Sequence, residues 1–524
     1  GNRIQVTADK PLSVSTYQQW LGNGELARHL PVEAWGRDYY TMNFYQDRYG
    51  SSGQGYKYRP GQIVVVAAYD NTVVSWSPVG ATEQGRDHPS VTKKGTGIVE
   101  LRKGETFLIK SKISDPPDAY NKDWVTDLSG TAIRSSRPVG VISGHTKVAI
   151  MRYPDVLPPT GMFATEAHFV RNNVHDAMLP IEMAGTEFVT VPAMYTSARV
   201  TGLNNTQFGI DDDRGDVVRF VALEDNMTIQ SMRQNGDGFK NIVKLNKGET
   251  WVETTVEFAT LWKSDKPVLV GQYGKSYAEI LPPTFGVNGD KGEKPLGHPT
   301  VKSGMPMLQY IPSVDRWVNY AVFRSPEGTD NFFNIVFKTE DVGKIKVDGR
   351  GLNSAFGGSM RPLQGSPYSY IRTPIGAGDH VVESVSEDIK WMAWTYGSLD
   401  GLQQGRAYGT PVAIDLAMPC DDSLDGKETI VCGDVEATAK ILPEDVECGH
   451  IFAIYAEGLN NYELVVDEAF SSGDPRAKFW VNVLDKTKDA EANILVISRS
   501  GKFVRKTYTY IADKIAWEPK SINF

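Results

Sequence analysis

The acidic run at residues 211–216 is the segment whose residue types most resemble those of a metal-binding site. Asp211, Asp212, Asp213 and Asp216 place four carboxylates on one short segment. Calcium takes six to eight oxygen ligands, and carboxylates on a turn can supply several of them. These residues are therefore a candidate calcium site. The spacing is not that of an EF-hand, and clustered Asp residues are also common at solvated hairpin tips. No other cofactor is predicted.

Two further patterns have both a functional and a structural interpretation. Residues 214–216 spell Arg-Gly-Asp, the integrin-binding tripeptide, which also arises easily by chance. His145, His168 and His175 lie close in sequence, and three converging neutral imidazoles would bind zinc. Their spacing does not enforce convergence, so scattered loop histidines are the simpler interpretation.

Three cysteines, Cys420, Cys432 and Cys448, lie near the carboxyl end of the chain. They lack the CxxC spacing of a zinc or thioredoxin site. In an exported protein, one disulfide and one remaining thiol would be the simplest arrangement, with free thiols as the alternative. Cys432 and Cys448 flank a strand-like run at residues 434–442, and we expect the bond to join these two.

Sequence motifs of catalysis are absent, because the chain contains no HExxH, no GxSxG and no P-loop. We therefore predict that the protein is not an enzyme. A net charge of −9 argues against nucleic acid as the main partner, since phosphate binding needs clustered Lys and Arg. No apolar run is long enough for a transmembrane helix, which needs about 18 residues or more.

One segment recurs along the chain and organises it. Copies begin at residues 6, 133 and 262, and each contains Lys-Pro or Arg-Pro followed by an apolar strand-like run. A weaker copy at residues 382–396 has lost the proline. The period of about 130 residues is longer than that of a propeller blade, which is about 40–50.

Other elements keep the same phase as this repeat. Residues 30–40 match residues 179–189 and, faintly, residues 311–320. Lys-Gly-Glu at positions 103 and 247 marks tight turns between runs that alternate apolar and polar residues. The sequence therefore predicts an all-β fold of repeated antiparallel modules. These would be sandwich-like, with a propeller-like arrangement as the alternative.

The last part of the chain changes character, with strand-like runs about 8–15 residues apart, which suits an immunoglobulin-like sandwich. The predicted organisation has an incomplete first strand, three modules, a linker and this sandwich: residues 1–28, 29–150, 151–285, 286–400, 401–412 and 413–524.

The motifs at residues 6–14, 30–40, 127–133 and 185–189 resemble those of the IgG-Fc-binding protein amino-terminal domain family. The resemblance covers roughly residues 1–410 and implies an extracellular, non-catalytic domain of adhesive or matrix type. It does not carry over immunoglobulin binding. Family members usually have further residues ahead of the first motif, so the chain is expected to start mid-module. Many also have cysteines where this chain has none, which points to a bacterial surface protein.

We therefore expect a secreted structural or adhesive protein with other protein subunits or surface glycans as partners. The alternatives are an array of carbohydrate-binding modules, with exposed Trp residues stacking on sugars, and a glycan-active hydrolase with a carboxylate pair. The incomplete strand at residues 4–16 would leave an open sheet edge. Such an edge invites homo- or hetero-assembly by strand pairing.

Overall fold

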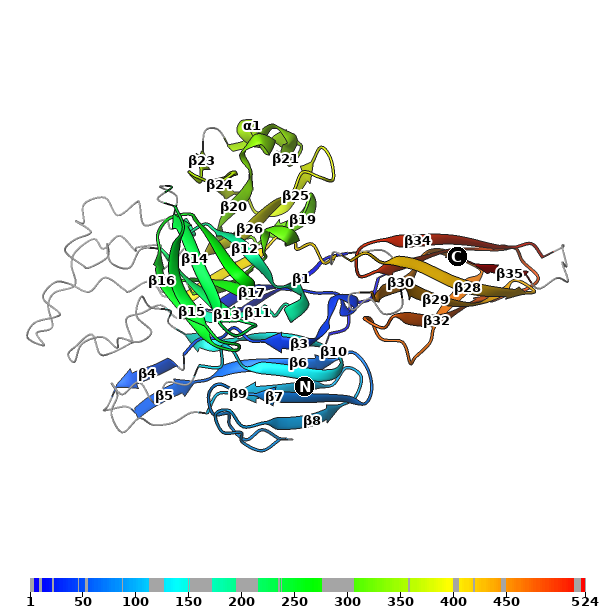
Figure 1. Cartoon of the computed structure of the whole chain (residues 1–524), viewed down its shortest axis with the longest axis horizontal. Coiled ribbons are helices and arrows are strands. Elements are labelled where there is room, and N and C mark those ends of the chain that lie inside the picture. The colour runs from blue at the N-terminus through cyan, green and yellow to red at the C-terminus, as the bar shows by residue number, and fades with distance from the viewer. Residues whose placement is uncertain are drawn as a thin grey trace, which may run out of the picture.

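The computed structural model of the chain consists almost entirely of β-strands, which confirms the predicted fold class (Figure 1). The structure describes residues 4–8, 12–20, 23–45, 47–51, 55–86, 88–112, 127–148, 150, 172–194, 215–233, 236, 238–275, 306–356, 359–398, 405–417, 420–443, 449–512 and 520–523. Over these ranges, helices are too short to cross a membrane.

Three copies of one β module follow each other along the chain. Module 1 contains β2 (Asn23–His29), η1 (Val32–Ala34), β3 (Gly36–Tyr40), β4 (Asp47–Ser51), β5 (Gly55–Arg59), β6 (Gly61–Ala67), β7 (Thr72–Ser77), β8 (Gly97–Leu101), β9 (Thr106–Lys110) and β10 (Ala132–Val148). Module 2 contains β11 (Asn172–Ala177), η5 (Ile181–Met183), β12 (Gly185–Thr190), β13 (Asp216–Ala222), β14 (Met227–Arg233), β15 (Lys240–Leu245), β16 (Thr250–Val256) and β17 (Thr260–Gly274).

Module 3 has the same plan with short additions. It contains β18 (Met307–Ile311), η10 (Val314–Arg316), β19 (Tyr320–Ser325), β20 (Asp330–Lys338), η11 (Thr339–Lys344), β21 (Ile345–Val347), β22 (Arg350–Gly351), α1 (Leu352–Phe356), β23 (Met360–Pro362), β24 (Tyr368–Ile375), β25 (Gly378–Ser384) and β26 (Trp391–Ser398).

Each module is a two-layer sandwich whose layers share one closing strand. In module 1, the first half of β10 pairs with β3 and β7, and its second half pairs with β6 and with β11 of the next module. In module 2, β17 pairs with β12 and β14, and then with β13 and β18. In module 3 the closing strand is divided. β25 pairs with β19 and β21, and β26 pairs with β20 and β27 (Gly405–Pro411).

The recurring sequence segment occupies equivalent positions in this topology, as predicted. Residues 133–144 lie in β10, residues 262–273 lie in β17, and residues 382–396 run from β25 into β26. The first copy leads into β1 (Val14–Trp20), which pairs with β2 in the way that the second half of β10 pairs with β11. β1 is therefore a closing strand of the same kind.

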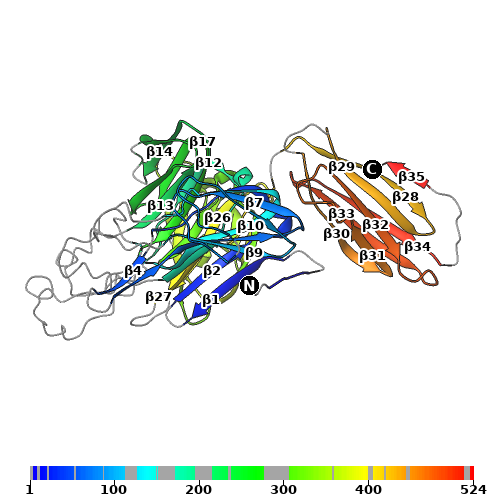
Figure 2. The same cartoon turned by 90° about the horizontal axis from the view of Figure 1, so that it is seen from below.

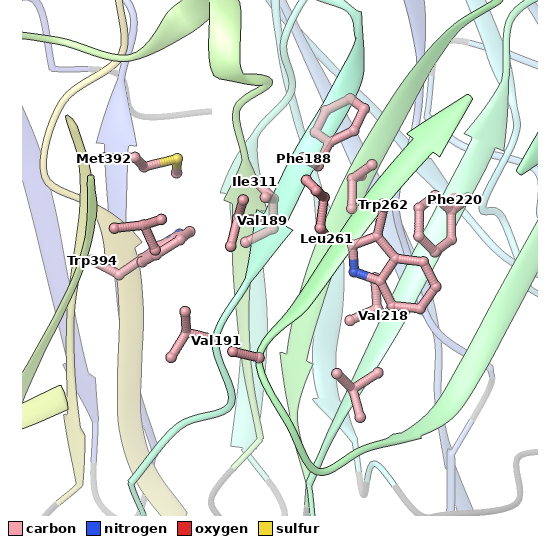
Figure 3. Packing of buried hydrophobic residues seen from close by; sticks show 14 of the residues in the cluster. Phe188, Val189, Val191, Val218, Phe220, Leu261, Trp262, Ile311, Met392 and Trp394 are labelled. Atoms are coloured by element: carbon pink, nitrogen blue, oxygen red, sulfur yellow. The ribbon is translucent and has the colours of Figure 1, made fainter. Parts of the chain in front are cut away.

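The sandwich cores are filled by large side chains that face each other across the two layers (Figure 3). In module 2, the rings of Phe220 and Trp262 lie 5.0 Å apart, and the same core continues to Trp394 of module 3. The indoles of Trp76 and Trp391 are also buried. These tryptophans therefore stabilise the modules and do not present faces to sugars.

The first strands of the modules meet at the centre of the molecule. β2 lies beside β11, β11 beside β18, and β18 beside β27. β27 pairs in parallel with β2 and so closes a ring of four strands. The modules thus surround this ring. The architecture therefore combines sandwich-like units with a propeller-like arrangement of these units. Figure 2 shows β1, β2, β27 and β26 side by side in one sheet.

The predicted linker at residues 401–412 differs from the structure, because residues 405–411 form β27. A Cβ atom at Gly409 would lie 2.6 Å from Sδ of Met307 in β18. Gly409 therefore allows close packing in the ring. The chain leaves the ring after β27, and Ile414 and Leu416 pack against the core of module 1.

A separate sandwich follows. Its strands are β28 (Ser423–Val431), β29 (Asp434–Leu442), β30 (Ile451–Asn460), β31 (Tyr462–Val466), β32 (Arg476–Val483), β33 (Ala490–Ser498), β34 (Phe503–Tyr510) and β35 (Lys520–Asn523). One sheet has the order β31-β32-β29-β28-β35 and the other β30-β33-β34. For the first seven strands, this is the ABED and CFG order of constant-type immunoglobulin domains.

The joints between successive modules depend on glycine. A Cβ atom at Gly36 would lie 2.3 Å from Cβ of Pro180 in module 2. A Cβ atom at the equivalent Gly185 would lie 2.3 Å from Cβ of Ser313 in module 3. Neither neighbour is the mobile end of a long side chain, so an added methyl group must push the modules apart.

We therefore expect Gly36→Ala to lower the free energy of unfolding by about 1–3 kcal/mol, as overpacked sites do. Urea unfolding followed by tryptophan fluorescence measures this difference. Gly376→Ala is the matched control, because nothing lies within 4 Å of its added Cβ. Equal stability of the two variants would contradict the proposed close contact.

Candidate functional site

The four central strands meet at a buried cluster of polar side chains, which we call the hub: Glu25, Asn172 and Asp176. The side chain of Asn172 in β11 pairs with the backbone of Gly24 in β2. Its Oδ1 accepts from the Gly24 N–H at 2.9 Å, and its Nδ2 donates to the Gly24 carbonyl at 2.5 Å. The same Nδ2 lies 2.8 Å from the carbonyl oxygen of Pro306 and 3.1 Å from that of Ala407 in β27. One amide thus connects three central strands with the residue before β18.

The carboxyl of Glu25 in β2 makes a second set of connections across the ring. Its Oε1 accepts from the N–H groups of Leu26 at 3.1 Å and Gly409 in β27 at 3.2 Å. Its Oε2 accepts from the N–H of Leu308 in β18 at 3.3 Å. All of these groups are buried, so Glu25 satisfies backbone donors that water does not reach.

The third hub residue is Asp176 of β11. Its Oδ1 accepts from the Ala177 N–H at 2.8 Å, and its Oδ2 accepts from the Tyr310 N–H in β18 at 3.2 Å. Burial raises the pKa of Asp176 to about 8, although these N–H groups oppose the shift. Burial also raises the pKa of Glu25 well above its usual value, with the charge of Asp176 contributing.

Two carboxyl groups with raised pKa values can serve as a catalytic acid and base when a substrate reaches them. Glu25 and Asp176 are 0% and 2% exposed, respectively. Their oxygens are occupied by backbone donors from the neighbouring strands. The geometry therefore supports a structural function for the pair, which ties the strands of the ring together.

A second buried ionic cluster joins modules 1 and 2. Nη1 of Arg219 in β13 lies 2.6 Å from Oδ2 of Asp127. The rings of Phe44, Tyr45 and Tyr273 surround the guanidinium at 5.7–5.9 Å. Burial alone would lower the pKa of Arg219, but Asp127 together with Tyr273 and Tyr45 more than offsets this, so the net pKa is raised and the guanidinium stays charged. The cluster holds the two modules together through a desolvated ion pair.

Asp216, a predicted calcium ligand, is buried at the start of β13. Its Oδ2 accepts from the Ala193 N–H at 2.8 Å and from Nε2 of Gln272 at 2.5 Å. This environment is not the exposed loop of a calcium or integrin site. Asp211, Asp212 and Asp213 lie outside the described residues, so the calcium site that includes them stays a prediction.

The described residues also contain no group of three or more His, Cys, Asp or Glu side chains that could hold a metal ion. Of the three histidines considered for zinc, His168 lies outside the described residues. Burial lowers the pKa of His145 to about 3 and that of His175 to about 4, so both are neutral at physiological pH.

Comparison with known proteins connects these features to a family. Residues 27–397 match the IgGFc-binding protein family. The chain belongs to this family. The match begins in β2 and ends in β26, so it covers the three modules and excludes the C-terminal sandwich.

A relative from Homo sapiens, the IgGFc-binding protein, is 21% identical over 386 residues. The aligned part is 73% of this chain but 6% of the human protein. The chain therefore spans a small part of the length of its relative.

The hub residues Glu25, Asn172 and Asp176 were not among the residues predicted from the sequence. Glu25 and Asp176 precede the Leu-Pro motifs at residues 30 and 179, within runs that form buried strands. An acidic residue inside a buried strand needs hydrogen-bond partners. Its presence in such a strand was the sequence signal that could have indicated a buried polar cluster. Their partners come from strands more than 100 residues away, so the sequence does not identify them.

The bonding of the cysteines differs from the prediction of a Cys432–Cys448 disulfide. Cys432 is a free, exposed thiol, and Cys420 is disulfide-bonded. Val431 pairs with Asp434, so Cys432 and Gly433 form the two-residue turn of a tight hairpin. Both have positive φ, as such turns require. Cys448 lies outside the described residues.

We therefore expect Cys420 to be bonded to Cys448, the third cysteine of the sequence. Alkylation of the native, unreduced protein should modify Cys432 alone, because that thiol is exposed. Peptide mapping should then recover one cross-linked pair of peptides containing residues 420 and 448. Recovery of a cross-link to residue 432 would show that the hairpin thiol is not free.

The raised pKa of Asp176 predicts that stability depends on pH. The unfolded carboxyl ionises near pH 3.8, but the folded one does so at about 8. The stability contributed by the neutral form is complete below the unfolded pKa and is lost as pH rises towards 8. The slope from this one group is at most roughly 1.4 kcal/mol per pH unit. Asp176→Asn should therefore lower the slope between pH 5 and 8, as measured by urea unfolding.

The exposed carboxyl of Glu100 in β8 provides the control, since Glu100→Gln should keep the slope of the parent protein. Glu25 adds a shift of the same sign, so Asp176→Asn retains part of the pH dependence. An unchanged slope in Asp176→Asn would contradict the assignment.

Proposed function

We propose that this chain is a non-catalytic extracellular protein with a structural or adhesive function, which binds other proteins on a rigid array of β modules. One observation carries the proposal. The buried groups with the chemistry of an active site, namely Glu25, Asp176 and the Arg219–Asp127 pair, are occupied in holding strands and modules together. Membership of a family named for binding supports the same conclusion.

The shape of the molecule also supports a scaffold. Three sandwiches surround one ring, and the C-terminal sandwich extends from module 1 to one side (Figure 1). A pocket lined by Arg233, Glu253 and Trp262 has an empty volume of about 210 Å³, part of which is open solvent. Ligand sites usually enclose about 300–1,000 Å³. Extended surfaces and strand edges are therefore better suited to partners than this pocket is.

The two alternative functions have less support. A carbohydrate-binding array needs exposed aromatic faces, and the indoles of Trp76, Trp262 and Trp394 are in the cores. A glycan hydrolase needs an accessible carboxylate pair, and the Glu25–Asp176 pair is enclosed. The expected bacterial origin has no support from the relative, which is human.

The exposed thiol of Cys432 provides a test of the location. On intact producing cells, a membrane-impermeant maleimide should label the protein to the same extent as after permeabilisation, because an extracellular thiol is already accessible. Cys432→Ser is the matched control and should remain unlabelled in both conditions.

Labelling that needs permeabilisation would contradict the extracellular location. The purified protein should also fail to release sugar from mixed glycan substrates. Turnover that survives Glu25→Gln and Asp176→Asn would reveal an active site elsewhere and overturn the non-catalytic function.

A further inference from the structure

The pocket lined by Arg233, Glu253 and Trp262 lies at one end of the module 2 sandwich. Arg233 is the last residue of β14, and Glu253 belongs to β16 in the other layer. Trp262 of β17 is part of the core between the two layers. The pocket therefore lies between the layers and reaches the core of the module.

The corresponding end of module 1 is closed by the chain itself. Ile109 of β9 is the counterpart of Glu253, because both lie across β6 or β13 from the same position of the recurring segment. Ile109 is fully buried, and its core includes Val91 from the connection between β7 and β8, residues 78–96. This connection therefore contributes an apolar side chain to the sandwich core.

The same connection also pairs with the outer edge of β9. The N–H of Glu83 donates to the carbonyl oxygen of Lys110 at 3.0 Å, and the N–H of Lys112 donates to that of Ala81 at 2.8 Å. An isolated bridge joins the same two segments. Module 1 is thus closed by one segment that pairs with the edge strand and adds to the core.

Module 3 is closed in a similar way by its short additions. Phe356 of α1 packs against Phe333 of the core, with the ring centroids 6.0 Å apart. β23 then pairs antiparallel with the outer edge of β24, which is the counterpart of β9. One segment, residues 352–362, therefore supplies both the side chain and the edge pairing.

Module 2 has no segment of this kind in the described part of the chain. Its connection between β14 and β15 consists of residues 234–239 only, much shorter than residues 78–96 of module 1. β16 is the last strand of its layer, and no described strand pairs with its outer edge. Phe258, which also lines the pocket, is 52% exposed. The pocket and the edge are thus open where the other two modules are closed.

The rim of the pocket carries charged groups of both signs. Arg233 and Glu257 are exposed, and Glu253 is half-buried. Within the described ranges, their charged groups form no ion pair and no side-chain hydrogen bond. A guanidinium donates hydrogen bonds and a carboxylate accepts them, so this rim can bind the carbonyl and N–H groups of a peptide.

We infer that this end of module 2 binds an extended segment of a partner protein, which supplies the closure that the module lacks. The segment pairs with the outer edge of β16 and inserts an apolar side chain beside Phe258 and Trp262. Strand addition supplies affinity through main-chain hydrogen bonds, and the pocket supplies specificity. The inference rests on the binding of other proteins proposed above and assigns that binding to one site.

The size of the pocket suits one side chain within a larger interface. An empty volume of about 210 Å³, part of which is open solvent, is smaller than a typical small-molecule site. A single anchoring side chain needs less room, and protein interfaces concentrate their affinity in a few such anchors. The exposed side chains of Arg233 and Glu257 can change rotamer as the anchor enters, which is common on binding.

A synthetic peptide of residues 78–96, the segment that closes module 1, is the probe. We expect it to bind the protein of residues 1–524 at one site. Hydrogen exchange of the β16 amides should slow on the order of tenfold or more, because their free edge gains partners. Amides of β13, which is paired on both edges, provide the internal reference. The same peptide with Val91→Asp should bind about tenfold more weakly, because the inserted side chain is then charged.

A substitution in the protein tests the pocket. Phe258→Ala should weaken peptide binding about tenfold, as the loss of an aromatic anchor does, and should leave the midpoint of urea unfolding unchanged. Phe503→Ala is the matched control, because Phe503 is exposed to a similar degree (58%) on the C-terminal sandwich. This change should affect neither measurement.

Four outcomes would overturn the inference. Two are a peptide that leaves the exchange of β16 unchanged and a peptide that binds Phe258→Ala as tightly as the parent protein. The third is slow exchange of β16, equal to that of β13, before peptide is added, since the chain would then close the module itself. The fourth is a dimer that the peptide dissociates, which would assign the site to a second copy. The labelling of Cys432 tests the extracellular location independently of all four.

Discussion

The burial of Glu25, Asn172 and Asp176 at the centre of the ring is the constraint on which the rest of the structure depends. Burying a polar group without a partner costs several kcal/mol, so each of these side chains needs its backbone donors and acceptors in place. Those groups belong to four strands from different parts of the chain. The hub therefore specifies which strands meet and in which register, while the apolar cores of the modules supply most of the stabilisation.

The same logic recurs inside each module with different residues. In module 1, Asn43 donates to Ser143, and in module 2, Gln272 donates to Asp216. In module 3, a hydrogen bond joins Ser325 to Thr395. Each pair connects the closing strand to another segment of the same module, so polar contacts to this strand recur with different chemistry. Asp216 supplies the polar contact to the closing strand β17 in module 2. This contact explains why Asp216 is buried although it follows an acidic run.

Features that depend on neighbouring residues were predictable from the sequence, and features that depend on distant partners were not. The turns at Lys-Gly-Glu and the alternation of the strands are local, so the all-β class and the repeat followed from them. Gly409 is small because β18 approaches it, a contact between segments about 100 residues apart. Its glycine-rich surroundings were therefore interpreted as a linker. The predicted pairing of Cys432 is wrong for a different reason: Cys432 lies in a local two-residue hairpin turn, which leaves its side chain exposed.

The two kinds of joint in the molecule differ in their physical character. Modules 1 to 3 are connected by shared closing strands, glycine contacts and desolvated polar clusters, so they cannot separate without breaking sheets. The C-terminal sandwich contacts module 1 through Phe452, which packs against the core of that module, and through polar groups. The polar contacts include a hydrogen bond from the Ser472 N–H to the Tyr69 hydroxyl at 3.0 Å and the Arg37–Asp474 pair at 3.3 Å. Both members of that ion pair are partly exposed, and such pairs contribute at most about 1 kcal/mol. The modules therefore act as one unit, and the sandwich is attached to it as a second unit with its own core.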